Sequence, residues 1–160
     1  MSRAAHFHGA GFAAMFPDET PITNAPWPQA SPSRTHRTYN PALVDEALKD
    51  PESHRRDVDP RNLHASQPNL TRAGVKHYME SDELMADSHQ AGNQHPVVFH
   101  DTTANREVLL SGHHRAAASL LQGGQFRPVV VEGAPATHEE AADYQRAQIQ
   151  ARRQASAASR

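Results

Sequence analysis

The stretch Leu109-Leu-Ser-Gly-His-His-Arg-Ala-Ala-Ala118 joins the end of an apolar strand to the start of an alanine-rich helix. Gly112 between them lets the backbone turn closely around a ligand. The first turn of the following helix presents unpaired N–H groups with partial positive charge. Arg115 adds a planar donor whose geometry suits phosphate oxygens, and His113 and His114 stand in the same turn. The stretch therefore predicts an anion-binding site.

A plainer interpretation of the same residues needs no ligand. Ser111 is a favoured residue type for capping the helix, and the two histidines would then be solvated. Adjacent helical residues point about 100° apart, so His113 and His114 do not share one metal ion. The sequence also holds no cysteine and no H-E-x-x-H pattern, the usual signs of a zinc site. We therefore expect no metal site.

The residues on both sides of this stretch predict alternating strands and helices. Short apolar runs bounded by turn residues are typical of strands, and apolar residues at helical spacing after Thr71 are typical of a helix extending to Leu84 and Met85. Gly123-Gly124 closes the helix after the motif. The predicted elements, in chain order, are strand 62–65, the helix from Thr71, strand 96–100, strand 106–110, helix 116–122 and strand 126–132. Residues 61–133 are thus predicted to be a β-α-β-β-α-β domain of the α+β class.

The two ends of the chain differ from this domain in composition. Eight of the twelve prolines precede Arg61, which predicts that residues 1–60 are an extended arm with one short helix at 41–49, capped by Asn40. Trp27 stands among these prolines and favours burial against a partner. In the tail, 134–160, a capping box at Thr137 predicts a helix. Its apolar face is small, which is typical of a solvated or partner-bound helix.

Charge and composition narrow the functions further. A formal charge of −2 over 160 residues gives no general positive field, so DNA affinity is expected to be weak and salt-dependent. It would rest on local clusters at Arg34, His36 and Arg37 and at Arg152 and Arg153. Neither a membrane span nor an export signal is visible. We therefore expect a cytoplasmic protein that does not bind membranes.

The motif resembles the Gly-x-x-Arg turn of the ParB/sulfiredoxin superfamily, which is followed by a helix and an apolar strand like Val129-Val-Val131. Upstream, Leu63-His-Ala-Ser-Gln-Pro68 resembles the first motif of that superfamily, in which a short strand ends in Gln-Pro ahead of a helix. The resemblance implies a ParB/sulfiredoxin-like fold that binds nucleotide or nucleic-acid phosphate, in a bacterial cytoplasmic or virion- or phage-associated protein. It leaves the cofactor open, with a nucleoside triphosphate and Mg²⁺ as one option. The residues it assigns to phosphate are Gly112, His113, His114, Arg115 and Gln67.

Departures from the family pattern limit the activities that carry over. His113 stands where sulfiredoxin has its reactive cysteine, which excludes sulfinic-acid repair, and Ser111 replaces the usual aspartate. The short tail is not expected to hold the helix-turn-helix DNA reader of partition proteins. Two functions remain open. One is a nuclease or a nucleotide-dependent phosphotransfer or hydrolysis enzyme, with its catalytic residues unassigned. The other is a non-catalytic interaction module whose arm and tail bind a protein partner or a second copy in a phage, plasmid or other assembly.

Overall fold

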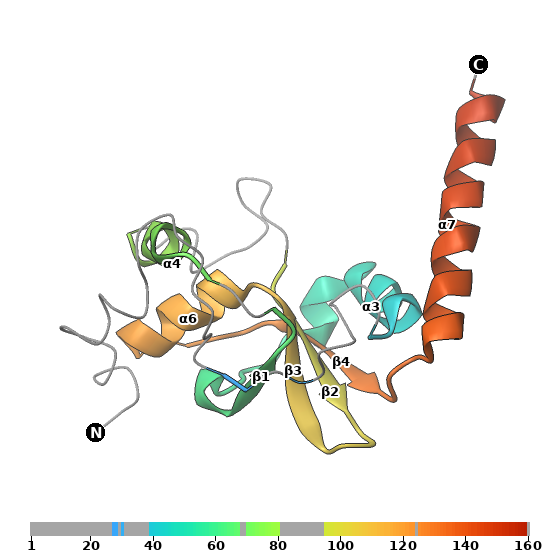
Figure 1. Cartoon of the computed structure of the whole chain (residues 1–160). Helices are drawn as coiled ribbons and strands as arrows, with labels where there is room; N and C mark the ends of the chain where they lie inside the picture. The colour runs from blue at the N-terminus through green and yellow to red at the C-terminus, as the bar shows by residue number, and fades with distance from the viewer. Residues whose placement is uncertain are drawn as a thin grey trace.

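The computed structural model describes residues 27–28, 30, 39–67, 70–80, 95–123 and 125–159. Leu84, Met85, Gly124 and the basic cluster at 34–37 lie outside the described residues. Four strands form one mixed sheet in the order β1-β3-β2-β4 (Figure 1). The strands are β1 (Leu63–Ala65), β2 (Val97–Asp101), β3 (Arg106–Ser111) and β4 (Val129–Gly133).

Four α-helices accompany this sheet in the described part of the chain. They are α3 (Pro41–Leu48), α4 (Arg72–Met79), α6 (His113–Gln122) and α7 (His138–Ala158), and short 3-10 turns occupy Pro51–His54 and Pro60–Asn62. From β1 to β4 the elements follow the predicted order β-α-β-β-α-β. The prediction of a mixed α+β domain is therefore confirmed.

Helices pack on both faces of the sheet, and successive strand residues point to opposite faces, so β2, β3 and β4 each contribute side chains to the hydrophobic clusters on both faces. In β3, Leu109 packs with α4 and α6 on one face, whereas Val108 and Leu110 pack on the other, where α3 lies. Figure 1 shows α4 and α6 together on one side of the sheet and α3 on the opposite side. β1 runs parallel to β3, β3 antiparallel to β2, and β2 parallel to β4.

The helix ends form as their capping residues predict. The side chains of Asn40 and Thr71 each accept a backbone N–H from the first turn of α3 and α4. Gly123 closes α6 in a left-handed conformation with φ of 69°. At the start of α7, Thr137 and Glu140 form the reciprocal capping box. Two helix ends differ from the prediction: α6 starts at His113 rather than Ala116, and α4 ends at Met79 with Glu80 as its C-cap, before the predicted Leu84 and Met85.

Several described arm residues belong to the core of this domain. Trp27 is 4% exposed and packs in the cluster of α4 and α6, while Tyr39 is 1% exposed and packs on Phe99 in the cluster on the opposite face of the sheet. The backbone N–H of Ala65 donates to Pro28, and that of Ala30 donates to Ala65. The outer edge of β1 is thus covered by the arm. The expectation that Trp27 gains its burial on a partner is wrong. The arm bonds to the edge of β1, and this places Trp27 in the core of its own chain.

The first turns of α7 rest on α3. Ala141 is buried, and the Tyr144 hydroxyl donates to the Asp45 carboxylate at 2.7 Å. From Ile149 onward, every described residue of the helix is exposed. None of the helices in the described part of the chain combines the length and the apolar character needed to cross a membrane.

Candidate functional site

The predicted motif lies at the edge of the sheet where two parallel strands end. Ala65 of β1 pairs with Leu109 of β3, so both strands finish on the same side. Gln67 follows β1, and α6 begins directly after β3. In sheets with parallel strands, ligands commonly bind just outside the carboxyl ends of the strands. The fold therefore brings Gln67 and the start of α6 to a position suited to ligand binding.

Gly112 forms the turn between β3 and α6. It is the N-cap of α6, with φ of 86° and ψ of 29°, and no side chain caps the helix there. A Cβ at this position would stand 2.7 Å from the Cβ of Pro96, so only glycine fits without a shift. Ser111 is the last residue of β3, and its hydroxyl donates to the His95 carbonyl at 3.1 Å. The plainer interpretation with Ser111 as the cap is therefore wrong.

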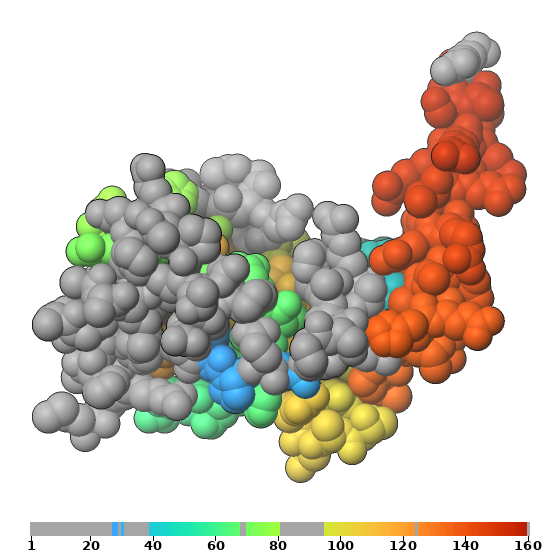
Figure 2. Space-filling view, in the orientation of Figure 1, coloured from blue at the N-terminus to red at the C-terminus, as the bar shows by residue number. Residues whose placement is uncertain are grey.

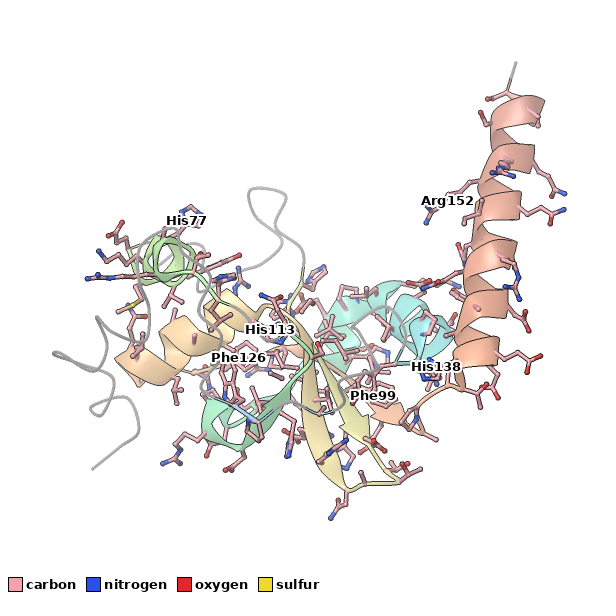
Figure 3. All side chains as sticks on the ribbon, in the orientation of Figure 1. His77, Phe99, His113, Phe126, His138 and Arg152 are labelled. Carbon is pink, nitrogen blue, oxygen red and sulfur yellow. The ribbon has the colours of Figure 1, made fainter. Side chains whose placement is uncertain are left out.

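His113 is enclosed by the fold. Its side chain is only 3% exposed, and its Nε2 accepts the backbone N–H of Ser66 at 3.2 Å. The indole of Trp27 meets the imidazole edge-on, with 6.3 Å between ring centroids. Figure 3 shows His113 at the junction of the sheet and α6. A solvated His113 is thus excluded, because the segment after β1 and the arm both pack against it.

His114 makes the matching contact on the other side of the helix start. Its Nε2 accepts the backbone N–H of Thr71 at 3.1 Å, ahead of α4. Gly74 leaves room for the ring, since a Cβ there would stand 2.5 Å from the imidazole Cδ2. An imidazole nitrogen accepts a hydrogen bond only when it carries no proton. The two histidines therefore tie the segment from Ser66 to Thr71 to α6 through their unprotonated Nε2 atoms.

Arg115 lies between the two helices on this face of the sheet. Its side chain is 5% exposed, and its guanidinium carbon is 5.1 Å from the centre of the Tyr78 ring. This is a cation–π contact within the fold. Arginine in the first turn of a helix is usually exposed, but Arg115 is buried because α4 packs directly over this turn of α6. Its positive charge nevertheless belongs to the first turn of α6, since Arg115 is the third residue of the helix.

A second cation, Arg55, lies near the site, and nothing in the sequence around it predicts this position. Arg55 is held by Glu52, with Nε donating at 2.9 Å, and by the Arg127 carbonyl, which accepts from Nη1 at 3.0 Å. Its Nη2 lies 2.7 Å from Nδ1 of His95, whose carbonyl accepts from Ser111. The contact joins residues 40 positions apart, and it forms because the 55–58 segment pairs with residues 126–129 at the start of β4.

The described residues contain no group of three or more histidine, aspartate, glutamate or cysteine side chains placed to hold a metal ion. Comparison with protein-family models, curated proteins and solved structures finds no match. The assignment of a function to this edge of the sheet therefore rests on its residues and their geometry.

Lowering the pH is expected to weaken the contact made by His114. Burial lowers the pKa of His114 below its usual 6.5. The unfolded chain therefore binds the proton first, so this contribution to stability is complete above about pH 6.5 and is lost as the pH falls. The cost of His114→Ala in the free energy of unfolding, measured by urea denaturation, should be smaller at pH 5 than at pH 7.5. An equal cost at both values would contradict a neutral, hydrogen-bonded imidazole.

Proposed function

We propose that this chain is a ParB/sulfiredoxin-like domain that binds the phosphate groups of a nucleotide or of nucleic acid at the start of α6. Two features support the family assignment. The described elements follow the order β-α-β-β-α-β, and Gln67 and the Gly-His-His-Arg residues follow the ends of adjacent parallel strands. The observation that carries the proposal is the left-handed turn at Gly112, which opens α6 without a side-chain cap.

The residues of the site have distinct roles in this proposal. Gly112 keeps side-chain atoms away from the helix start, where first-turn N–H groups attract an anion. Gln67 supplies a side-chain amide from the neighbouring strand end. His113 and His114 hold the segment that carries Gln67 in place, through Ser66 and Thr71. Arg115 adds positive charge within the first turn while it packs on Tyr78.

These contacts favour binding over chemistry by the motif itself. His113 and His114 each accept a backbone N–H with the ring nitrogen that a general base would use. Arg115 is covered by an aromatic ring. The three motif side chains that carry charge or titrate thus all make contacts within the fold, and none of them is assigned a catalytic role here.

Isothermal titration of the full chain with the four nucleoside triphosphates, with and without Mg²⁺, tests the proposal. We expect at least one to bind. Gln67→Ala should weaken that binding about tenfold, because a hydrogen bond to a charged group contributes roughly 1.5 kcal/mol. The matched control is Gln122→Ala at the opposite end of α6, where the side chain donates to the Met79 carbonyl. The control should bind like the parent, and a folded parent that binds none of the four would contradict the proposal.

The second candidate is a non-catalytic ParB-like module that binds a partner within a phage, plasmid or other assembly. The exposure of α7 beyond Gln148 favours it, because this part of the helix buries nothing within the chain. Trp27 and Tyr39 of the arm are buried in the core, so these two residues do not contact such a partner. Absence of nucleotide binding in the same titration would leave this module as the better account.

A further inference from the structure

α7 stands out from the domain as a single helix. Its base is fixed by Ala141, which is buried, and by Tyr144, which bonds to Asp45 on α3 and to Gln148 one turn on. Beyond this base, the residues from 149 to 159 are all exposed. Figure 2 shows this end of the chain, in red, projecting away from the body of the molecule. We refer to residues 146–158 as the distal segment.

The distal segment carries positive charge and no carboxylate. It contains Arg146, Arg152 and Arg153, and no aspartate or glutamate follows Asp143 in the sequence. Asp143 forms an ion pair with Arg146. Figure 3 shows Arg152 on this projecting part of the helix. Because the protein as a whole has a charge of −2, this concentration of cations is local, and it complements a polyanion.

The apolar surface of the distal segment is too small for the other usual partners of an exposed helix. Ile149, 48% exposed, is its one large apolar side chain. A membrane-surface helix needs a broad apolar face, and a coiled coil needs apolar residues repeated every three to four positions. Two copies of the segment laid side by side would also bring like charges together. The positive charge of the distal segment, and not its apolar surface, therefore indicates which kind of partner it binds.

The remaining side chains suit the major groove of DNA. Residues at helical spacing form one face of the segment and line a shallow hollow. They are Arg146, Ile149, Gln150, Arg153, Gln154 and Ala157. Arginine and glutamine are side chains that form bidentate hydrogen bonds with guanine and adenine in that groove. The groove of B-form DNA is about 12 Å wide and admits a helix, whereas the deep major groove of duplex RNA does not.

We propose that the distal segment of α7 binds duplex DNA by lying in its major groove. Arg146 and Arg153 lie on one face of the helix, which would face the base edges. Arg152 lies about 100° around the helix from Arg153, toward the phosphates of the groove wall. This interface is separate from the phosphate site at α6 and goes beyond the function proposed for that site, so either proposal stands if the other fails.

The test uses the full chain and a fluorescein-labelled 20-base-pair DNA duplex of random sequence, followed by anisotropy from low to moderate salt. Replacing Arg146, Arg152 and Arg153 together by glutamine should weaken binding at least tenfold. It should also lower the slope of log affinity against log salt by at least about 0.9, the contribution of the one phosphate contact assigned to Arg152. Circular dichroism checks that the helix content is kept.

A matched variant removes three exposed cations from the domain itself. Arg56, Arg61 and Arg127 each have a carboxylate partner, namely Glu132, Asp59 and Asp57. Replacing these three by glutamine should leave the salt slope close to that of the parent. Changing the distal arginines to lysine should keep most of the slope while reducing affinity, because lysine retains charge but not the bidentate contact.

Four results would overturn the proposal. They are no binding of the duplex at 50 mM salt, an equal loss of binding in the two glutamine variants, equal affinity for a duplex RNA of the same sequence, and a dimer in light scattering that the distal variant abolishes without any change in DNA binding. The last of these would assign the segment to a second copy of the chain.

Discussion

Trp27→Ala is expected to lower the free energy of unfolding by about 3 to 5 kcal/mol, the usual cost of removing a large aromatic side chain from a core. Trp27 is 4% exposed, packs with α4 and α6, and donates from its indole N–H to the Pro60 carbonyl at 2.6 Å. It also forms one wall of the His113 pocket. Trp27 is the only tryptophan in the chain, so the variant has no tryptophan fluorescence to report unfolding. Urea denaturation of both proteins is therefore followed by circular dichroism.

Ile149→Ala provides the control for this experiment. Ile149 is 48% exposed on the projecting part of α7, so its truncation should change stability by less than about 0.5 kcal/mol. A Trp27→Ala protein as stable as the Ile149→Ala protein would show that residues near Trp27 are an independent arm, as the proline content of residues 1–60 suggested.

Gly112→Ala is expected to disturb both stability and ligand binding. The left-handed conformation costs an alanine about 1 to 2 kcal/mol, and the contact of 2.7 Å with Pro96 adds roughly 1 to 3 kcal/mol of overpacking. The turn must shift to relieve this contact, which moves the first N–H groups of α6. We therefore expect a loss of about 2 to 5 kcal/mol in denaturation and a clear loss of nucleotide affinity in calorimetry.

Gly123→Ala separates the two costs. Gly123 has φ of 69° at the other end of α6, but a Cβ there would meet no atom within 4 Å. This variant should lose only the 1 to 2 kcal/mol of backbone strain and should bind nucleotide like the parent. Equal effects of the two substitutions would mean that the space beside Pro96 has no importance for the site.

Local patterns in the sequence were sufficient to predict the order of the strands and helices and most of the helix caps. Asn40, Thr71, Thr137 and Gly123 all cap the helices as their residue types suggest, because capping depends on neighbours within a few positions. The hairpin of β2 and β3 depends on a short turn in the same way.

The environment of the motif residues could not be predicted, because distant segments create it. Arg115 is buried by α4, His113 by Trp27 and by the segment after β1, and Arg55 reaches His95 across the sheet edge. Residue type alone suggested exposed side chains around a turn. Only tertiary packing determines which of them are enclosed, and the assignment of Gln67 and the motif to phosphate remains a prediction for the titration to test.

The strand order also constrains how the chain folds during synthesis. Both parallel pairings join distant parts of the sequence, Leu63 with Glu107 and Val97 with Val129. Such long-range pairings slow folding, because a large loop must close before any contact compensates for it. β4 supplies residues to both hydrophobic clusters and leaves the ribosome after the other strands. Trp27 is made early yet belongs to one of these clusters, so the nascent chain exposes it until nearly the whole domain has been translated.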